Sequence, residues 1–208
     1  MRQMGARAVC VSVLLVGTTA VLLGARFQST YRAPDVDAVN FADKKVAALV
    51  ITTDKSIEAV AEDQLAAELT ARGAQGVAAW RVVPRETLQD TDRTSAFFAR
   101  ASIDGVLAIR VMKVERPLSY LPDMWDMPHY ASLWGYYGYG WSRAIGFGEL
   151  REDTVVTIEA LAFSVRLNRM IWAGMSEVTP PSGARKLLKD LAKEATKEMA
   201  KQGLIVKR

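Results

Sequence analysis

The sequence is poor in the residues that most often carry enzyme chemistry. It has one cysteine, Cys10, and one histidine, His129, among its 208 residues. Because no cysteine follows Cys10, disulfide bonds and a cysteine nucleophile are excluded for the rest of the chain. A serine–histidine–acid triad would depend on His129, and the sequence contains no nucleophile elbow, phosphate-binding loop or dinucleotide fingerprint. None of the enzyme classes that use these motifs is indicated, and we expect a protein that is not an enzyme.

Metal, cofactor and nucleic-acid binding are not predicted either. Asp123, Asp126 and His129 are spaced by three residues, but Pro122 and Pro128 make a helix there unfavourable, so the spacing does not place the three side chains together. The net charge is only +4, and basic and acidic residues alternate without forming a basic cluster. We therefore predict no metal, no cofactor and no nucleic-acid partner.

The amino terminus carries a localisation signal. Arg2 and Arg7 precede an uncharged, largely apolar run over residues 8–25. Such a pattern predicts that residues 1–25 are a signal peptide or an N-terminal membrane anchor. The run ends in a lipobox-like sequence in which Ala25 stands where the lipidated cysteine would be, so we expect no lipid at this position. Cleavage near Ala25 with release and retention as an uncleaved anchor are both open, and both predict an exported, periplasmic protein.

The remaining chain reads as a polar tether over residues 26–43 and one α/β domain over residues 44–208, although an α+β arrangement is also possible. Half of all residues are hydrophobic, which is enough to build a core. Residues 45–53 form an apolar run typical of a strand buried on both faces. A helix capped by Asp54 or Ser56 should follow and end at Gly73. Its apolar stripe consists of Ile57, Val60, Ala61, Leu65 and Leu69, with Glu58, Glu62, Asp63 and Glu68 largely off the stripe.

The later elements complete a β-α-β-α-β-(long loop)-β-β-α order with a mixed sheet packed by helices. Strands are predicted over residues 77–83 and 104–116, with a helix over 92–101 between them. A β-hairpin over residues 154–165 and 170–178 should turn at residues 167–168 and place Phe163 opposite Trp172. The last helix follows Ser182, and its apolar stripe contains Leu191.

An aromatic, glycine-rich insertion over residues 121–150 separates the third strand from the hairpin. Its glycines argue against a helix, and its length argues for a functional loop. Three interpretations remain: the rings fold back onto a sheet or helix face, they form a protein-binding surface, or they contact a membrane interface. The candidate residues for binding a partner or ligand are Trp134, Tyr136, Tyr137, Tyr139 and Trp141.

Arg110 and Glu159 are the charged residues in the middle of otherwise apolar strands. If the two strands are neighbours, these side chains could pair across the sheet. A buried acid beside an arginine can mark an active site, but a structural ion pair or an exposed face is the more common explanation.

Several short segments resemble a group of uncharacterised bacterial exported lipoproteins, namely residues 44–53, 71–74, 104–107, 132–137 and 171–177. The order of elements is also similar to that of small α/β domains in envelope assembly factors, such as the TolB N-terminal domain and the curli-secretion and penicillin-binding-protein-activator lipoproteins. This resemblance implies a non-enzymatic cell-envelope protein that binds a partner protein or supports envelope assembly. A small-molecule or glycan binder that uses the aromatic loop is the alternative, and an enzyme based on Glu159 and Arg110 is a third.

Overall fold

The computed structural model describes residues 26–34, 36, 39–112, 124–146, 156–178 and 184–206. The predicted signal peptide or anchor, residues 1–25, lies outside these ranges, as do residues 113–116 of the third predicted strand. No helix within the described ranges combines the length and the apolar character needed to span a bilayer.

The elements confirm the predicted α/β class. In chain order they are β1 (Ser29–Arg32), β2 (Lys45–Ile51), α1 (Lys55–Arg72), β3 (Gln75–Ala78), α2 (Thr91–Arg100), β4 (Gly105–Met112), α3 (Leu133–Ser142), β5 (Val156–Ser164), β6 (Arg169–Val178) and α4 (Ala184–Lys201). The six strands form one mixed sheet in the order β1-β6-β5-β4-β2-β3, in which β2 is parallel to β3 and β4 and the other neighbours are antiparallel.

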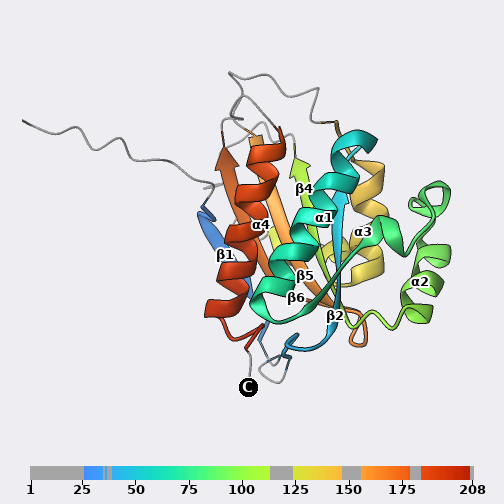
Figure 1. Ribbon diagram of the computed structural model, residues 1–208. Helices are drawn as coiled ribbons and strands as arrows, with labels where there is room; N and C mark the ends of the chain where they lie inside the picture. The colour runs from blue at the N-terminus through green and yellow to red at the C-terminus, as the bar shows by residue number, and fades with distance from the viewer. Residues whose placement is uncertain are drawn as a thin grey trace, which may run out of the picture.

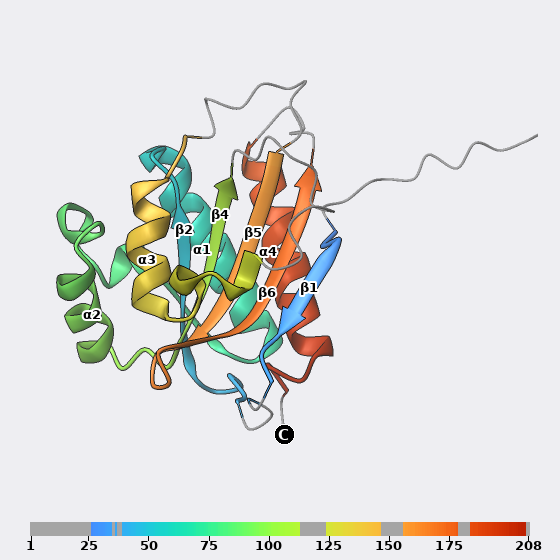
Figure 2. The same ribbon diagram turned by 180° about the vertical axis from the view of Figure 1, so that it is seen from behind.

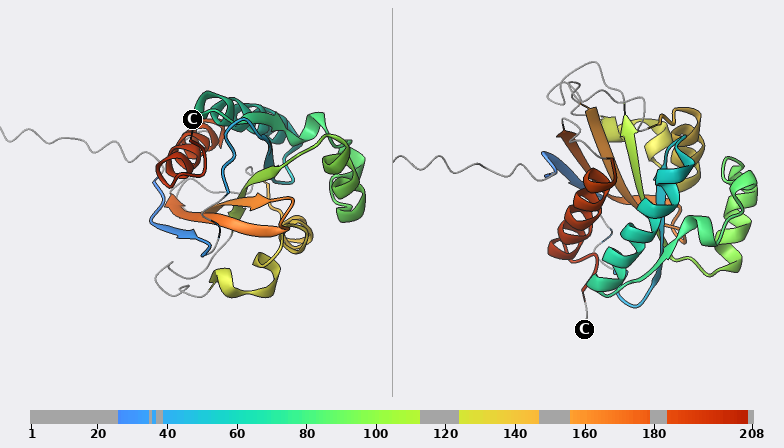
Figure 3. Two further views of the ribbon diagram at one scale, coloured as in Figure 1. Left: turned by 90° about the horizontal axis from the view of Figure 1, so that it is seen from below. Right: turned by 45° about the horizontal axis from the view of Figure 1, so that its top comes forward.

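Helices cover both faces of this sheet. Helices α1 and α4 lie side by side on one face, while α3, with α2 beside it, lies on the other (Figures 1 and 2). The layers are seen end-on in Figure 3. Residues that alternate along the strands divide between two apolar clusters, one on each face, because successive side chains of a strand point to opposite sides.

The first strand–helix–strand unit follows its sequence signals closely. The Asp54 carboxylate accepts hydrogen bonds from the backbone N–H groups of Ser56 and Ile57 and so caps α1, and Gly73 ends the helix at a φ of 108°. Leu65 is fully buried, as its place on the apolar stripe predicts. The stripe was wrong at Val60, which is 37% exposed, and at Glu62, which is fully buried.

Strand β3 is shorter than predicted and ends at Ala78, where the chain enters the 3-10 helix η1 (Ala79–Arg81). The buried Glu62 explains this early end. Its carboxylate accepts the backbone N–H of Val50 at 3.0 Å and that of Trp80 at 2.8 Å. Glu62 therefore satisfies a donor on the edge of β2 that a longer β3 would have paired.

The β5–β6 hairpin turns where predicted, with Asn168 at a φ of 45°. The predicted pairing of Phe163 with Trp172 is wrong, and the register of the hairpin is irregular between Ala162 and Phe163. Ala162 stands opposite Trp172, and Phe163 stands opposite Met170. Since one residue of slip reverses the face of a side chain, Phe163 packs on the α3 side and Trp172 on the α4 side.

The expectation of a tether over residues 26–43 is corrected by the structure. This segment contains β1, which pairs antiparallel with β6. Phe27 packs edge-to-face on Trp172 with ring centroids 5.4 Å apart, and Ala33 and Phe41 are buried in the core. Within the described residues, the segment from Phe27 onward is therefore part of the fold and does not act as a free tether.

Candidate functional site

The aromatic segment forms helix α3, so the prediction that its glycines exclude a helix is wrong. The Ser132 hydroxyl caps the helix by accepting the N–H of Gly135 at 3.1 Å. At Gly140 an added Cβ would lie 2.7 Å from Ile51 Cδ1, so the missing side chain lets the helix approach β2. Each glycine costs about 1 kcal/mol of helix propensity, whereas each buried aromatic ring contributes more than that. Tertiary packing therefore outweighs local preference here.

The five candidate aromatic residues have different surroundings. Tyr136 and Tyr137 are fully buried, and the Tyr137 hydroxyl donates to the Leu88 carbonyl. Trp134, Tyr139 and Trp141 are half-buried. In this fold Tyr136 and Tyr137 have no surface to offer a partner, and the other three rings do.

Arg110 and Glu159 form a buried cross-strand ion pair, which was one of the arrangements that their positions in the sequence left open. They stand directly opposite each other on β4 and β5, and Arg110 Nε lies 2.6 Å from Glu159 Oε1. The Arg110 side chain is 2% exposed and that of Glu159 is fully buried. Both point toward α3, because their strand neighbours on either side pack against α1 and α4.

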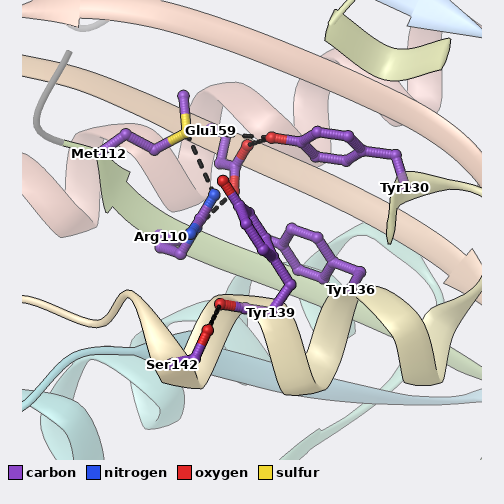
Figure 4. Close-up of polar contacts among 7 residues, drawn as sticks. All are labelled: Arg110, Met112, Tyr130, Tyr136, Tyr139, Ser142 and Glu159. Atoms are coloured by element: carbon purple, nitrogen blue, oxygen red, sulfur yellow. Dashed lines mark hydrogen bonds and ion pairs between the residues drawn. The ribbon is translucent and has the colours of Figure 1, made fainter. Parts of the chain in front are cut away.

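Two tyrosine hydroxyl groups complete the coordination of the Glu159 carboxylate. Tyr136, from α3, donates to Oε1 at 2.7 Å, and Tyr130, from the 3-10 helix η5 (Pro128–Tyr130), donates to Oε2 at 2.8 Å. Together with the bond from Arg110, these contacts give the carboxylate three charge-assisted hydrogen bonds (Figure 4). We call Arg110, Glu159, Tyr130 and Tyr136 the buried polar cluster.

Besides its bond to Glu159, the Arg110 guanidinium makes weaker contacts with a sulfur atom and with two aromatic rings. Nη2 donates to the Met112 sulfur at 3.2 Å. The guanidinium carbon lies 4.9 Å from the centre of the Tyr139 ring and 5.6 Å from that of Tyr136, within the range of cation–π attraction. The Tyr139 ring also stacks on His129 with centroids 3.7 Å apart. Tyr139 therefore contacts both Arg110 of the buried polar cluster and the half-buried His129.

The electrostatics of the cluster fix its protonation. Burial and the neighbouring Glu159 raise the pKa of both Tyr130 and Tyr136. Burial opposes the charge on Arg110, but Tyr136 and Glu159 favour it more strongly, and the net effect raises the Arg110 pKa. Burial and nearby Arg110 lower the pKa of His129. Both tyrosines are therefore hydrogen-bond donors and His129 is neutral at pH 7.

This arrangement can hold elements together, but it offers little for catalysis. The Glu159 carboxylate has no exposed surface, and its partners already occupy both oxygens. The cluster joins η5 and α3 to β4 and β5, and its residues Arg110 and Glu159 are 49 residues apart in sequence. Among the described residues no group of histidine, cysteine, aspartate and glutamate side chains could hold a metal ion. Asp126 and His129 are described, whereas Asp123 lies outside the described ranges.

Sequence reasoning missed a second buried acid, Glu62, on the α1 side of the sheet. Burial raises its pKa to about 8, although its hydrogen bonds from Val50 and Trp80 favour the charged form. Its helical neighbour Glu58 is also buried, and burial raises that pKa too. Glu62 lies four residues after Glu58 and three residues before Leu65. In a helix this spacing places it on the buried side of α1, and it could have identified Glu62 as a buried acid.

A shallow hollow of about 520 Å³ lies between α1 and the edge strand β3, and its lining includes Asp63, Thr70, Gly76 and Arg81. None of the five candidate aromatic residues lines it. The aromatic residues that retain exposed surface therefore belong to the flanks of α3 and not to this hollow.

No protein-family model and no curated protein matches the sequence. Among solved structures, the chain is similar to the PelC dodecamer from Paraburkholderia phytofirmans, with 15% identity, a TM-score of 0.43, and coverage of 86% of this chain and 97% of that chain. A variant of the same dodecamer matches with 15% identity, a TM-score of 0.42, and coverage of 83% and 94%. A likeness this distant transfers neither an activity nor a partner.

Proposed function

We propose that this chain is a non-catalytic protein of the bacterial cell envelope that binds a partner protein through the outer face of α3. The observation that carries the proposal is the position of three half-buried rings, Trp134, Tyr139 and Trp141, on a helix that is fixed from beneath by the buried polar cluster. Half-exposed tyrosine and tryptophan rings on a rigid support are typical anchors of protein interfaces.

The shape of the α3 surface supports this use. Trp134 and Trp141 are seven residues apart and lie on one flank, where both rings contact Tyr137. Tyr139 lies on the other flank, where Arg143 is 5.7 Å from its ring centre. Between the flanks, the outermost positions of α3 include the exposed Gly135 and Ser142. Small residues between aromatic walls let the backbone of a partner come close.

The amino-terminal pattern supports the compartment. Basic residues followed by the uncharged run of residues 8–25 are typical of export or membrane anchoring. The saturated, inaccessible carboxylate of Glu159 supports a structural role for the Arg110–Glu159 pair over a catalytic one.

The experiment is photo-crosslinking in isolated envelopes from a photoreactive residue at Ser142, which is exposed at the outer end of α3. We expect one envelope protein to be captured by the wild-type chain and lost when Trp141 is replaced by Ala. Trp80→Ala is the matched control, because Trp80 is also half-buried but packs under Arg81 on the α1 side. Unchanged capture in Trp141→Ala, or no protein captured at all, would contradict the proposal. Capture of a glycan in place of a protein would favour the alternative function.

A further inference from the structure

Three side chains on the Tyr139 flank of α3 carry polar groups that the fold leaves unused. The Tyr139 hydroxyl, the Arg143 guanidinium and the His129 imidazole each lack a hydrogen-bond partner among the described residues. Arg143 also forms no ion pair within that part of the chain. Arg143 is exposed, and the other two side chains are half-buried, so all three retain surface that a ligand can contact. We call His129, Tyr139 and Arg143 the flank site.

The local structure brings these three side chains together. Tyr139 lies in the last turn of α3, and Arg143 follows four residues later as the C-terminal cap, so both are on the same side of the helix. The Arg143 guanidinium carbon is 5.7 Å from the Tyr139 ring centre. His129 comes from η5, which the bond from Tyr130 to Glu159 holds in place, and stacks on the same ring with centroids 3.7 Å apart. The buried polar cluster thus fixes both elements that supply the flank site.

The flank site carries positive charge that the protein does not neutralise. Among the described residues, Tyr139 is the one ring with two guanidinium groups in cation–π range, because Arg110 also lies 4.9 Å from its centre. Arg110 and Arg143 contribute two positive charges and Glu159 contributes one negative charge, so one positive charge remains while His129 is neutral. The carboxyl-terminal end of α3 opposes an anion with only about half a unit charge. The site therefore favours a ligand with a single negative charge.

We propose that the flank site binds a carboxylate, and that this carboxylate is an aspartate or glutamate side chain of the partner protein. A carboxylate carries one negative charge and only accepts hydrogen bonds, so it matches both the remaining charge and the donors of Arg143 and Tyr139. A phosphate monoester carries up to two negative charges near pH 7, which is more than the site neutralises. The inference rests on the proposed function, because it assigns the chemistry by which the partner contacts the outer face of α3.

Occupation of the site is coupled to the protonation of His129. Burial and the guanidinium groups of Arg110 and Arg143 lower the pKa of His129, whereas Glu159 opposes them. The ring of Tyr130 also contacts the imidazole, with centroids 4.4 Å apart. A bound carboxylate adds negative charge beside the imidazole and raises its pKa. By linkage, carboxylate binding should strengthen as the pH falls from 8 to 6.

The first test uses His129 as its reporter, because the chain contains a single histidine and the signal needs no assignment. The full-length chain, labelled with carbon-13 at histidine, is titrated with pH by NMR in detergent solution. Sodium acetate is the carboxylate probe, and sodium chloride at the same ionic strength controls for screening. We expect acetate to raise the pKa of His129 above its value in chloride. An equal pKa in the two salts, or tighter binding of methyl phosphate than of acetate, would overturn the proposal.

A variant and a matched control locate the effect. Arg143→Gln removes the exposed charge but keeps a long polar side chain, and it should weaken acetate binding roughly fivefold. Arg185→Gln is the control, because Arg185 is exposed on α4, on the opposite face of the sheet, and should leave acetate binding unchanged. Equal acetate binding by the wild type and Arg143→Gln would overturn the assignment of the site.

Photo-crosslinking from Ser142 separates this site from the partner surface as a whole. Arg143→Gln should lose most of the partner capture, and Arg185→Gln should keep it. Capture that survives Arg143→Gln but is lost in Trp141→Ala would support the partner surface and overturn the carboxylate site. Acetate binding at His129 without any captured protein would instead overturn the partner, and with it the assignment of the carboxylate to a protein side chain.

Discussion

The two faces of the sheet are packed by different means. On the α4 face, Leu65 and Leu191 belong to regular apolar stripes and make no directional bonds through their side chains. On the α3 face, the aromatic helix is attached to the sheet by hydrogen bonds from Tyr130 and Tyr136 to a buried carboxylate. A stripe tolerates small shifts of a helix, whereas the polar cluster specifies one position of α3 and η5. The hydrogen bonds that fix the position of α3 therefore lie beneath the surface that we propose for partner binding.

The largest effect is expected when the polar cluster loses its acceptor. Glu159→Ala leaves Arg110 as a buried, unpaired charge and leaves two tyrosine hydroxyl groups without a partner, so we expect a loss of about 3–5 kcal/mol in the free energy of unfolding. Denaturant titration measures it. The double variant Arg110→Met with Glu159→Leu should recover part of this loss, because it removes the unpaired charge. A loss below about 1 kcal/mol in Glu159→Ala would show that the cluster does not hold the fold together.

On the apolar face, Leu191→Ala and Leu65→Ala should each cost about 2–5 kcal/mol, because each removes buried methyl groups and leaves a cavity. Both side chains are at most 1% exposed. The control is Leu167→Ala in the exposed β5–β6 turn, where Leu167 is 43% exposed and the expected loss is near zero. If the core and control variants unfolded at the same denaturant concentration, the apolar packing of this face would be refuted.

Tyr136 and Tyr139 both lie on α3, but only the hydroxyl group of Tyr136 forms a hydrogen bond within the described residues. Tyr136→Phe removes a hydrogen bond to a buried charge and should cost about 1.5–3 kcal/mol. Tyr139→Phe removes a hydroxyl group that makes no hydrogen bond within the described residues and should change stability by less than about 0.5 kcal/mol. Thermal unfolding of both variants compares them directly, and equal losses would contradict the bonding pattern.

A pH dependence of stability is expected from Glu62, and its size grows with the width of the pH range. Its pKa is about 8 in the folded protein and lies near the ordinary value of 4.5 in the unfolded chain. The folded state therefore holds the proton more tightly, and stability is greatest below pH 4.5 and falls as the pH rises toward 8. The slope from this group is at most about 1.4 kcal/mol per pH unit.

Glu62→Gln is the variant that isolates this contribution, because it cannot titrate while Glu58 and His129 titrate in both proteins. It should be less stable than the wild type at low pH, since the amide cannot accept from both Val50 and Trp80. The difference in unfolding free energy between the two proteins should shrink from pH 5 to pH 8. A difference that stays constant with pH would contradict the raised pKa.

The sequence predicts best what depends on repeating local patterns. Strand β2, the caps of α1, the stripe of α4 and the turn at Asn168 follow from spacing and residue type. The pairing of Arg110 with Glu159 was also predictable, because two charged residues in apolar strands require a partner.

What the sequence does not predict depends on contacts between distant segments. Helix α3 forms against the propensity of its glycines because its rings have the sheet and η5 to pack on. The partners of Glu62 are backbone groups, which no pattern of side chains reveals. The register shift at Ala162 depends on the geometry of the whole hairpin. Tyr130 and Tyr136 as ligands of Glu159 could be identified only once η5 and α3 were placed.

The position of Glu62 has a consequence for self-association. A sheet that stops at a short strand leaves unpaired backbone donors at its step, and such donors can recruit a strand from another molecule and start aggregation. Strand β3 has four residues, and at the step beyond it Glu62 covers the N–H of Val50 while also binding that of Trp80. The Glu62 carboxylate therefore occupies the backbone donor at which a strand of another molecule could add to the sheet. Mutants at this position should aggregate from the folded state before they lose their core.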